Sequence, residues 1–390
     1  MLVDSMIGDV AIVGAGPAGA CLGYLLARRG VYAAIYDDSH PREKPCGGGL
    51  TPFAQWRFPI LEGIPSSGKR VDRMLLISPK GRRALVPVPT LANVSREVLD
   101  GYLLEKALDS GASLVGERVI AVEGDSGSWL VRTQAGARRF GLVVGADGAA
   151  SVVRRATVGP IPREDLAAGI GCYARGVEMD YSVMRFLKGF KGYAWIFPRE
   201  THSSVGIGLD VRGARQLPAL LNEFIDCFCP NIERLSSFGA MLPAPRNRRF
   251  YRLPCAGANW VLIGDAAGHV DPLLGEGIRY ALWDAELAAE AIAAENPAGF
   301  DILWRQAYLQ DLVKARGLVK LAYNPVMLEL IVMMAARSPT FRRIMAGVVM
   351  RDRPYVGLKR RAAASLPRIV AEAAAAPAAR NGRVGGASRS

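Results

Sequence analysis

DVAIVGAGPAG, residues 9–19, opens the stretch that decides the fold, and the stretch closes at Asp37. Residues 10–13 are apolar and rich in β-branched side chains, which is typical of a buried parallel strand. A helix is predicted over residues 20–29, because leucines recur there at helical spacing and a glycine follows. A second apolar strand over residues 33–36 leads to the acid. The order strand, glycine turn, helix, strand and acid predicts a unit that binds a dinucleotide.

The glycine turn gives the physical reason for that prediction. The first glycine permits a tight turn, the second lets a pyrophosphate approach the backbone, and the third lets the helix pack closely on its strand. The helix start adds free N–H groups and the positive end of the helix dipole. The acid is placed to accept hydrogen bonds from a ribose. The residues predicted to bind the nucleotide are Gly14, Gly16, Pro17, Ala18, Gly19 and Asp37.

A second glycine-rich segment, KPCGGG at residues 44–49, follows the acid. Three successive glycines near prolines give a backbone that can lie close beneath a flat ring. Arg96 begins a helix predicted after the N-cap residue Ser95, and its position favours contact with a phosphate. We therefore expect further cofactor contacts from Lys44, Cys46, Gly47, Gly48, Gly49 and Arg96.

Two more predicted strands end in an acid. Residues 140–145 and residues 260–263 are apolar, and an aspartate beside a glycine follows each of them. Acids at the carboxyl ends of parallel strands lie at the ligand crevice of a doubly wound sheet. The segment DPLLGEGI, residues 271–278, brings the start of another predicted helix to the same crevice. The cofactor contacts expected from these elements are Asp147, Gly148, Gly264, Asp265, Pro272, Gly275, Gly277 and Ile278.

Period-two patterning in residues 60–92 and 165–255 predicts antiparallel strands between these elements. The expected fold is of the α/β (α+β) class: a Rossmann-type nucleotide-binding domain with a parallel sheet, an antiparallel-sheet substrate domain and a C-terminal helical segment. The expected boundaries are 1–58, 93–160 and 250–297 for the first domain, 59–92 and 161–249 for the second, 298–370 for the helical region and 371–390 for a disordered tail.

Tyr193, Trp195 and Phe197 alternate along one predicted strand, so their side chains share a face of the sheet. Such a row is consistent with ordinary core aromatics. It is also consistent, together with Pro198, with a wall that binds an apolar substrate beside a cofactor ring. The sequence pattern leaves both interpretations open.

Composition narrows the class and the partners of the protein. Of 390 residues, 50% are hydrophobic and 22% are charged, which is typical of a globular chain. The net charge of +13 raises nucleic acid as a partner, but no recognition motif supports it, so none is expected. Amphipathic helices predicted over residues 298–370 carry a basic side. This side fits peripheral contact with an anionic membrane and equally a basic-edged helical cap.

The six cysteines are scattered along the chain, which indicates free thiols in a reducing compartment rather than disulfides. Because only three histidines are available, no metal site is expected. We see neither a targeting segment nor an uninterrupted apolar run long enough to span a membrane. The expected location is the cytoplasm, with peripheral contact at the inner face of the membrane.

The three glycine-acid elements, in this order and spacing, resemble the FAD-binding fold of the para-hydroxybenzoate hydroxylase type over roughly residues 7–350. The resemblance implies that the dinucleotide is FAD and that the first glycine cluster with Asp37 holds its ADP half. Residues 145–148 resemble the DG motif of that superfamily. Gly264-Asp265 resembles its GD motif, whose aspartate meets the ribityl chain.

Within that superfamily, KPCGGG at 44–49 and YAWIFP at 193–198 resemble the geranylgeranyl reductase family. The resemblance implies that reduced flavin delivers a hydride to a double bond of a polyprenyl chain on a lipid, quinone or related isoprenoid, while a proton reaches the other carbon. It implies catalytic roles for Cys46, Tyr193 and Trp195, with Cys46 or Tyr193 near the proton path. Leu274 and the pair Trp283-Asp284 depart from common superfamily residues and leave the subfamily open.

Two alternative functions remain at this point. An FAD-dependent monooxygenase or halogenase acting on an aromatic or apolar molecule uses the same scaffold, although Tyr193, Phe197 and the triple glycine favour the reductase. A prenyl-carrying escort protein of the GDP-dissociation-inhibitor type lacks a working flavin, and retention of all three acids argues against it. No second dinucleotide unit is visible, so the reductant is either transiently bound NADPH or a separate electron-donor protein such as ferredoxin.

Overall fold

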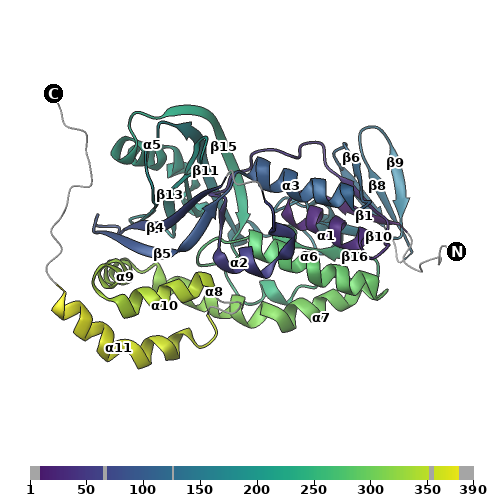
Figure 1. Ribbon diagram of the computed structural model, residues 1–390. Helices are drawn as coiled ribbons and strands as arrows, with labels where there is room; N and C mark the ends of the chain where they lie inside the picture. Colours follow the sequence, from purple (N-terminus) through teal and green to yellow (C-terminus); the bar gives the residue numbers. More distant parts are fainter. Residues whose placement is uncertain (1–8, 65–67, 125–126, 351–354, 377–390) are drawn as a thin grey trace.

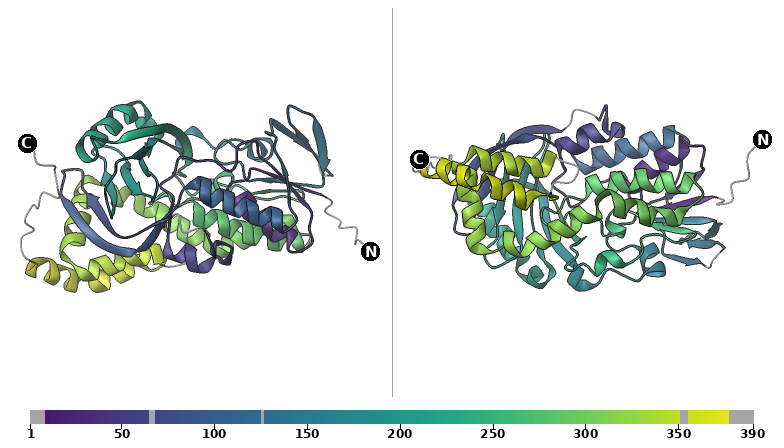
Figure 2. Two further views of the ribbon diagram at one scale, coloured as in Figure 1. Left: turned by 45° about the horizontal axis from the view of Figure 1, so that its top comes forward. Right: turned by 90° about the horizontal axis from the view of Figure 1, so that it is seen from below.

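The computed structural model describes residues 9–64, 68–124, 127–350 and 355–376. A parallel sheet lies at one end of the molecule and a larger, mostly antiparallel sheet at the other (Figure 1). The C-terminal helices run along the underside of both (Figure 2). The mixed α/β class expected from the sequence is confirmed.

The parallel sheet has the strand order β16-β10-β1-β2-β6, and every neighbouring pair in it is parallel. Its strands are β1 (Val10–Val13), β2 (Ala33–Tyr36), β6 (Ser113–Val115), β10 (Leu142–Gly145) and β16 (Trp260–Leu262). Three helices pack together beside it: α1 (Pro17–Ala27), α3 (Arg96–Asp109) and α6 (Ile278–Ala293). Helix α1 begins earlier than predicted, because proline suits the first helical turn.

The predicted strand over residues 140–145 is wrong as a single element. Phe140 ends a strand of a small three-stranded sheet, and Leu142 begins β10 of the parallel sheet. Between them, the N–H of Gly141 donates to the carbonyl of Asp9. The apolar run is continuous in sequence while the chain changes sheets, so hydrophobicity alone could not reveal the break. The small sheet consists of β7 (Ala121–Gly124), β8 (Trp129–Arg132) and β9 (Ala137–Phe140).

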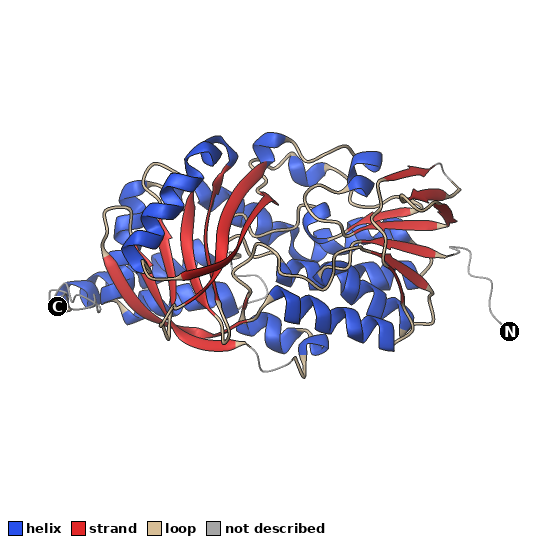
Figure 3. Cartoon of the chain, turned by 90° about the horizontal axis from the view of Figure 1, so that it is seen from above, coloured by secondary structure: helices blue, strands red, loops and turns tan. Residues whose placement is uncertain are grey.

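The large sheet lies on the left of Figure 3, in red. Its order is β15-β11-β14-β13-β12-β4-β5-β3, and among its described strands only β12 and β4 run parallel. Helix α5 (Leu217–Phe228) packs on one face. The opposite face carries the side chains of Tyr193 and Trp195, whose register partners are Phe186 and Met184. The strands are β3 (Gly49–Leu50), β4 (Lys69–Ile77), β5 (Arg83–Asn93), β11 (Leu166–Arg175), β12 (Ser182–Phe186), β13 (Gly192–Pro198), β14 (Ser203–Asp210) and β15 (Glu233–Pro243).

The C-terminal region is helical, and its helices α9 and α10 pack against β5 of the large sheet. The helices are α7 (Phe300–Trp304), α8 (Gln310–Ala322), α9 (Pro325–Arg337), α10 (Pro339–Met350) and α11 (Leu358–Ala375), with a π-helical turn at Arg305–Leu309. Two short helices, α2 (Pro52–Arg57) and α4 (Val152–Thr157), lie earlier in the chain. Among the described residues no single helix is long and apolar enough to cross a membrane; residues 297–322 and 325–337 meet that test only as a pair bent by 100°.

The disordered tail expected from residue 371 is wrong for its first residues, because α11 continues to Ala375. Alanine-rich sequence favours a helix as strongly as it suggests low complexity. Glu372 also ties α11 to the start of α10, since its carboxylate accepts hydrogen bonds from Ser338 and Thr340. Residues 377–390 lie outside the described part of the chain. The exact domain boundaries stay a prediction.

Candidate functional site

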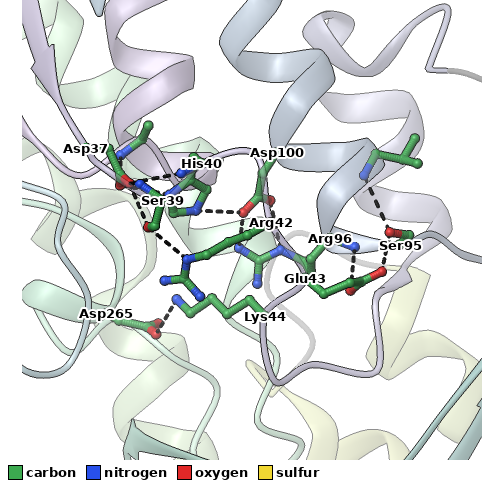
Figure 4. Close-up of polar contacts among 12 residues, drawn as sticks. Asp37, Ser39, His40, Arg42, Glu43, Lys44, Ser95, Arg96, Asp100 and Asp265 are labelled. Carbon is green, nitrogen blue, oxygen red and sulfur yellow. Dashed lines mark hydrogen bonds and ion pairs between the residues drawn. The ribbon is translucent and has the colours of Figure 1, made fainter. Parts of the chain in front are cut away.

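Asp37 sits directly after β2, and its carboxylate faces the glycine turn (Figure 4). Its Oδ2 atom accepts the Ala15 N–H at 2.9 Å, and its Oδ1 atom accepts the Ser39 N–H at 2.8 Å. The Nδ1 atom of His40 lies 2.7 Å from Asp37 Oδ2. Although burial opposes it, these hydrogen bonds hold the pKa of Asp37 well below its ordinary value. The acid therefore stays ionised beside the turn.

A buried chain of charges continues from this acid into α3 (Figure 4). His40 Nε2 lies 3.2 Å from Asp100 Oδ2, and Arg96 holds the same carboxylate in a two-pronged contact of 2.8 and 2.7 Å. Burial lowers the pKa of His40, but hydrogen bonds to Asp100 and Asp37 outweigh it and raise that pKa. The side chain of Arg96, expected to meet a phosphate, is thus buried and paired within the protein. Its role toward a phosphate stays a prediction.

The glycine turn has the geometry that a bound pyrophosphate requires. Gly14 has a φ of 103°, and a Cβ there would lie 2.5 Å from the Ala146 carbonyl oxygen. A Cβ on Gly19 would lie 1.9 Å from the Gly14 carbonyl oxygen. By contrast, a Cβ on Gly16 would have, among the described residues, only His40 Nε2 within 4 Å. The backbone at Gly16 is therefore open, as a phosphate-binding turn must be.

The three acidic elements lie next to one another, around the glycine turn and Lys44. The turn at Gly14 touches the backbone of Asp147, whose Oδ2 accepts the Val152 N–H at 2.6 Å. The buried Asp147 Oδ1 has no hydrogen-bond partner among the described residues, and burial raises the pKa of this acid. The Nζ atom of Lys44 lies 3.9 Å from Asp265 Oδ2 and adjoins Gly148. Lys44 thereby bridges the second and third acidic elements.

The third element meets the start of α6. A Cβ on Gly277, the residue before α6, would lie 3.3 Å from Asp265 Oδ1. Gly264 has a φ of 58° and its N–H donates to Asp284 Oδ2 at 2.7 Å. Asp284, which departs from the common superfamily residue, therefore anchors the backbone next to Asp265. Pro272 and Gly275 lie in the loop before α6, and Ile278 is its first residue.

The glycine segment after Lys44 lies against the large sheet. The carbonyl of Cys46 accepts hydrogen bonds from Arg199 at 3.1 Å and from Ser204 at 3.0 Å. The Gly48 N–H points to Cys46 Sγ at 3.3 Å, and a Cβ on Gly48 would lie 2.0 Å from the Val94 carbonyl oxygen. The predicted segment is therefore held at Cys46, and only glycine fits at its centre.

The predicted aromatic row lines this same region, but its three members differ in role. The Tyr193 hydroxyl donates to the Leu274 carbonyl at 2.7 Å, in the loop before α6. The ring centre of Trp195 lies 6.1 Å from that of Tyr193, and the indole N–H of Trp195 donates to Ser204 Oγ at 3.1 Å. The ring of Phe197 packs on the glycine segment, next to the position that a Cβ on Gly47 would take. Pro198 ends the strand and is buried.

Sequence reasoning missed several residues that hold the site. Glu43 accepts hydrogen bonds from the Ser95 hydroxyl, from the Arg96 N–H and from Arg199. Burial opposes its ionisation, yet these contacts and His202 lower the pKa of Glu43 to about 2. A charged residue next to a predicted cofactor segment is a signal for such an anchor. Its partners, however, are up to 156 positions away, so they could not be named.

The open turn at Gly16, the ionised Asp37 and the buried, unpartnered oxygen of Asp147 fit the phosphates and hydroxyls of a dinucleotide. Together with the Rossmann-type sheet, this site defines an FAD-dependent oxidoreductase. A profile described as an FAD binding domain matches residues 8–45.

The chain is 32% identical to menaquinone reductase of Mycobacterium tuberculosis over an alignment of 408 positions, which covers 93% of this chain and 97% of the relative. It is 29% identical to geranylgeranyl diphosphate reductase of Rhodobacter capsulatus, covering 75% and 76%. The chain belongs to this family of FAD-dependent reductases.

The fold also matches solved structures. A geranylgeranyl bacteriochlorophyll reductase-like protein of Thermoplasma acidophilum superposes with a TM-score of 0.77 at 19% identity, over 94% of this chain and 98% of that one. The flavin-dependent brominase Bmp2 superposes with a TM-score of 0.72 at 20% identity, over 93% and 99%. At these identities the likeness shows the fold alone.

Proposed function

We propose that this protein is an FAD-dependent reductase that saturates C=C bonds of a polyprenyl chain carried by a quinone, a lipid or a related isoprenoid. The observation that carries the proposal is the position of Tyr193 and Trp195. They form an aromatic surface between the Cys46 segment and the loop that leads into α6 beside Asp265. The relatives named as menaquinone and geranylgeranyl reductases support the choice of substrate class.

When bound, the flavin supplies the hydride, while the chain orients the substrate, excludes water and supplies a proton. Trp195 and Tyr193 present ring faces to an apolar chain and exclude water from cationic character at the alkene. Burial raises the pKa of Tyr193, so its hydroxyl stays protonated and is held at the Leu274 carbonyl. Cys46 Sγ accepts the Gly48 N–H within the glycine segment and is the second candidate to deliver the proton.

The test is anaerobic incubation of dithionite-reduced protein with menaquinone and with a panel of geranylgeranylated lipids, read by product mass. We expect the gain of two hydrogens in the polyprenyl chain for each reduced bond, measured after air has returned any quinol to quinone, and no such gain when the protein is left out. A product that forms only with dioxygen, or that carries oxygen or halogen, would contradict the proposal. It would support the monooxygenase or halogenase alternative, to which the brominase-like fold also conforms.

We further propose that the C-terminal helices bring the protein to a membrane surface on the cytoplasmic side. Helices α8, α9 and α11 expose large apolar side chains: Leu321, Val326, Leu330, Leu366 and Val370. Exposed Lys314, Lys320, Lys359, Arg360 and Arg368 lie on the same helices. Apolar side chains within a basic surface suit anionic headgroups. This location would bring the enzyme to a lipid-borne substrate.

Co-sedimentation with anionic and neutral vesicles tests this surface. Val326→Glu is expected to reduce binding to anionic vesicles several-fold, since it places a negative charge on the exposed face of α9. Leu108→Glu, an exposed leucine of α3, is the matched control and should bind as the wild type does. Equal binding of both variants would show that this surface does not bind the membrane.

A separate measurement identifies the reductant. It compares the rate of flavin reduction by NADPH with the rate by reduced ferredoxin.

A further inference from the structure

We propose that two tyrosines of the C-terminal region, Tyr323 and Tyr355, position the cofactor-side loop 271–277 together with Tyr193. The C-terminal helices are then part of the flavin site rather than only a covering layer. The inference deepens the proposed function and rests on it for the identity of the reacting ligand. It concerns residues to which the sequence pattern gave no role.

The loop occupies the part of the crevice where the third acid lies. Gly277 adjoins Asp265, and Gly275 adjoins the Tyr193 hydroxyl, which would lie 3.5 Å from a Cβ on that glycine. The loop also leads into α6, whose first residue follows Gly277 and whose positive dipole end therefore lies next to Asp265. A shift of this loop would therefore move both the contact with Asp265 and the helix start.

Two consecutive carbonyls of the loop receive tyrosine hydroxyls from different parts of the chain. Tyr193 of β13 donates to the carbonyl of Leu274 at 2.7 Å. Tyr323, the C-cap of α8, donates to the carbonyl of Leu273 at 3.0 Å. The large sheet and the helical region therefore hold neighbouring peptide groups of one loop.

The third tyrosine acts on the turn that shapes the loop. Asp271 Oδ1 accepts the N–H groups of Leu273 and Leu274 at 2.7 and 3.0 Å, which closes the turn. Tyr355 is 2% exposed, and its hydroxyl donates to Asp271 Oδ2 at 2.6 Å. Asp311 of α8 in turn accepts the Tyr355 N–H at 2.8 Å. The segment between α10 and α11 is thus tied to the turn through Asp271.

All three hydroxyls are held in buried surroundings as neutral donors. Burial raises the pKa of Tyr193, of Tyr323 and of Tyr355, so none of them ionises near neutral pH. Removing one hydroxyl leaves a buried acceptor without its donor and frees one side of the loop. We expect the loop to lose its fixed position relative to Asp265 while the aromatic ring keeps its packing.

The test uses Tyr323→Phe and Tyr355→Phe in the full chain, without any polyprenyl substrate. The readouts are the Kd for FAD, from flavin fluorescence, and the midpoint potential of the bound flavin. Each variant is expected to weaken FAD binding by about five- to hundredfold, the range set by one lost buried hydrogen bond, and to shift the potential. Tyr102→Phe is the matched control, because Tyr102 also donates to a backbone carbonyl, that of Glu62, at an exposed place.

Unchanged Kd and potential in both variants, relative to Tyr102→Phe, would overturn the inference. If Tyr355→Phe fails to fold, Tyr323→Phe decides alone, since its ring is only partly buried. The outcome is separable from that of the proposed function. Altered flavin properties in a protein that reduces no polyprenyl chain would refute the substrate class and keep the role of the tyrosines.

Discussion

The two ends of the crevice are held by different chemistry. At the Asp37 end, a continuous row of ion pairs runs from Asp37 through His40 and Asp100 to Arg96. At the Tyr193 end, neutral hydroxyls and an indole N–H donate to backbone carbonyls and a serine hydroxyl. Charged pairs suit a site for a polar nucleotide, whereas the neutral donors of Tyr193, Trp195 and Tyr323 suit an apolar ligand. The two ends of one site therefore suit different ligands: the polar half of the cofactor at one end and the proposed apolar substrate at the other.

Breaking the charged end should produce the largest effect on stability. Asp100→Ala removes the partner of a buried guanidinium and of His40, and we expect the free energy of unfolding to fall by about 3–5 kcal/mol. Urea unfolding of the holoprotein measures the change. The matched control is Glu123→Ala, which breaks an exposed ion pair with Arg132 and should leave the free energy of unfolding nearly unchanged. Equal losses in both variants would show that the buried chain has no special weight.

Asp37→Ala should act on the cofactor more than on the fold. The carboxylate is ionised beside the turn and accepts the Ala15 N–H, so its loss should cost about 1.5–3 kcal/mol of FAD binding, roughly 10- to 150-fold in Kd. Titration of the apoprotein with FAD measures it. An unchanged Kd would remove Asp37 from the nucleotide site.

At the neutral end, substitutions should slow the reaction without emptying the flavin site when FAD is saturating, although Tyr193→Phe also frees one side of loop 271–277 and should weaken FAD binding. We expect Tyr193→Phe and Cys46→Ser each to lower kcat for alkene reduction by about tenfold, since each alters a candidate proton path. Steady-state kinetics, with flavin content as the control, measures the effect. Normal turnover in both variants would exclude these residues from proton delivery.

The smallest expected effect is a pH dependence at the charged end. Burial opposes the charge on His40, but Asp100 and Asp37 face it and raise its pKa above 6.5. Its contribution to stability is therefore fully present below pH 6.5 and is lost as the pH rises through the raised value. Denaturant midpoints of wild type and His40→Gln should differ most below pH 6.5 and converge as the pH rises past the raised pKa of His40. A difference that grows with pH would contradict the assignment.

Much of the charged end could be predicted from sequence, because its parts are local. The strands at residues 10–13 and 33–36 and the glycine turn between them are confirmed in position. The family and the reductase class implied by KPCGGG and YAWIFP are confirmed by the relatives. The assignment of individual site residues stays a prediction, although the structure places most of them around one crevice.

The aromatic residues of the neutral end could be predicted, but their contacts could not, because those contacts join distant segments. Nothing near Leu274 in the sequence indicates that its carbonyl meets Tyr193, which is 81 positions away. Arg96 shows the other limit. Its place at a helix start suggested a phosphate, but Asp100, one turn further along α3, takes up the guanidinium. An acid four positions along the same helix is a signal that competes with ligand binding.

The central claim is that a polyprenyl double bond, and not dioxygen, reoxidises the flavin held in this crevice. Stopped-flow absorbance of the reduced holoprotein, mixed anaerobically with a geranylgeranylated lipid that carries no quinone ring, tests it directly. The account predicts rapid return of the oxidised flavin spectrum in step with the saturated product. Flavin that stays reduced until air is admitted would contradict it.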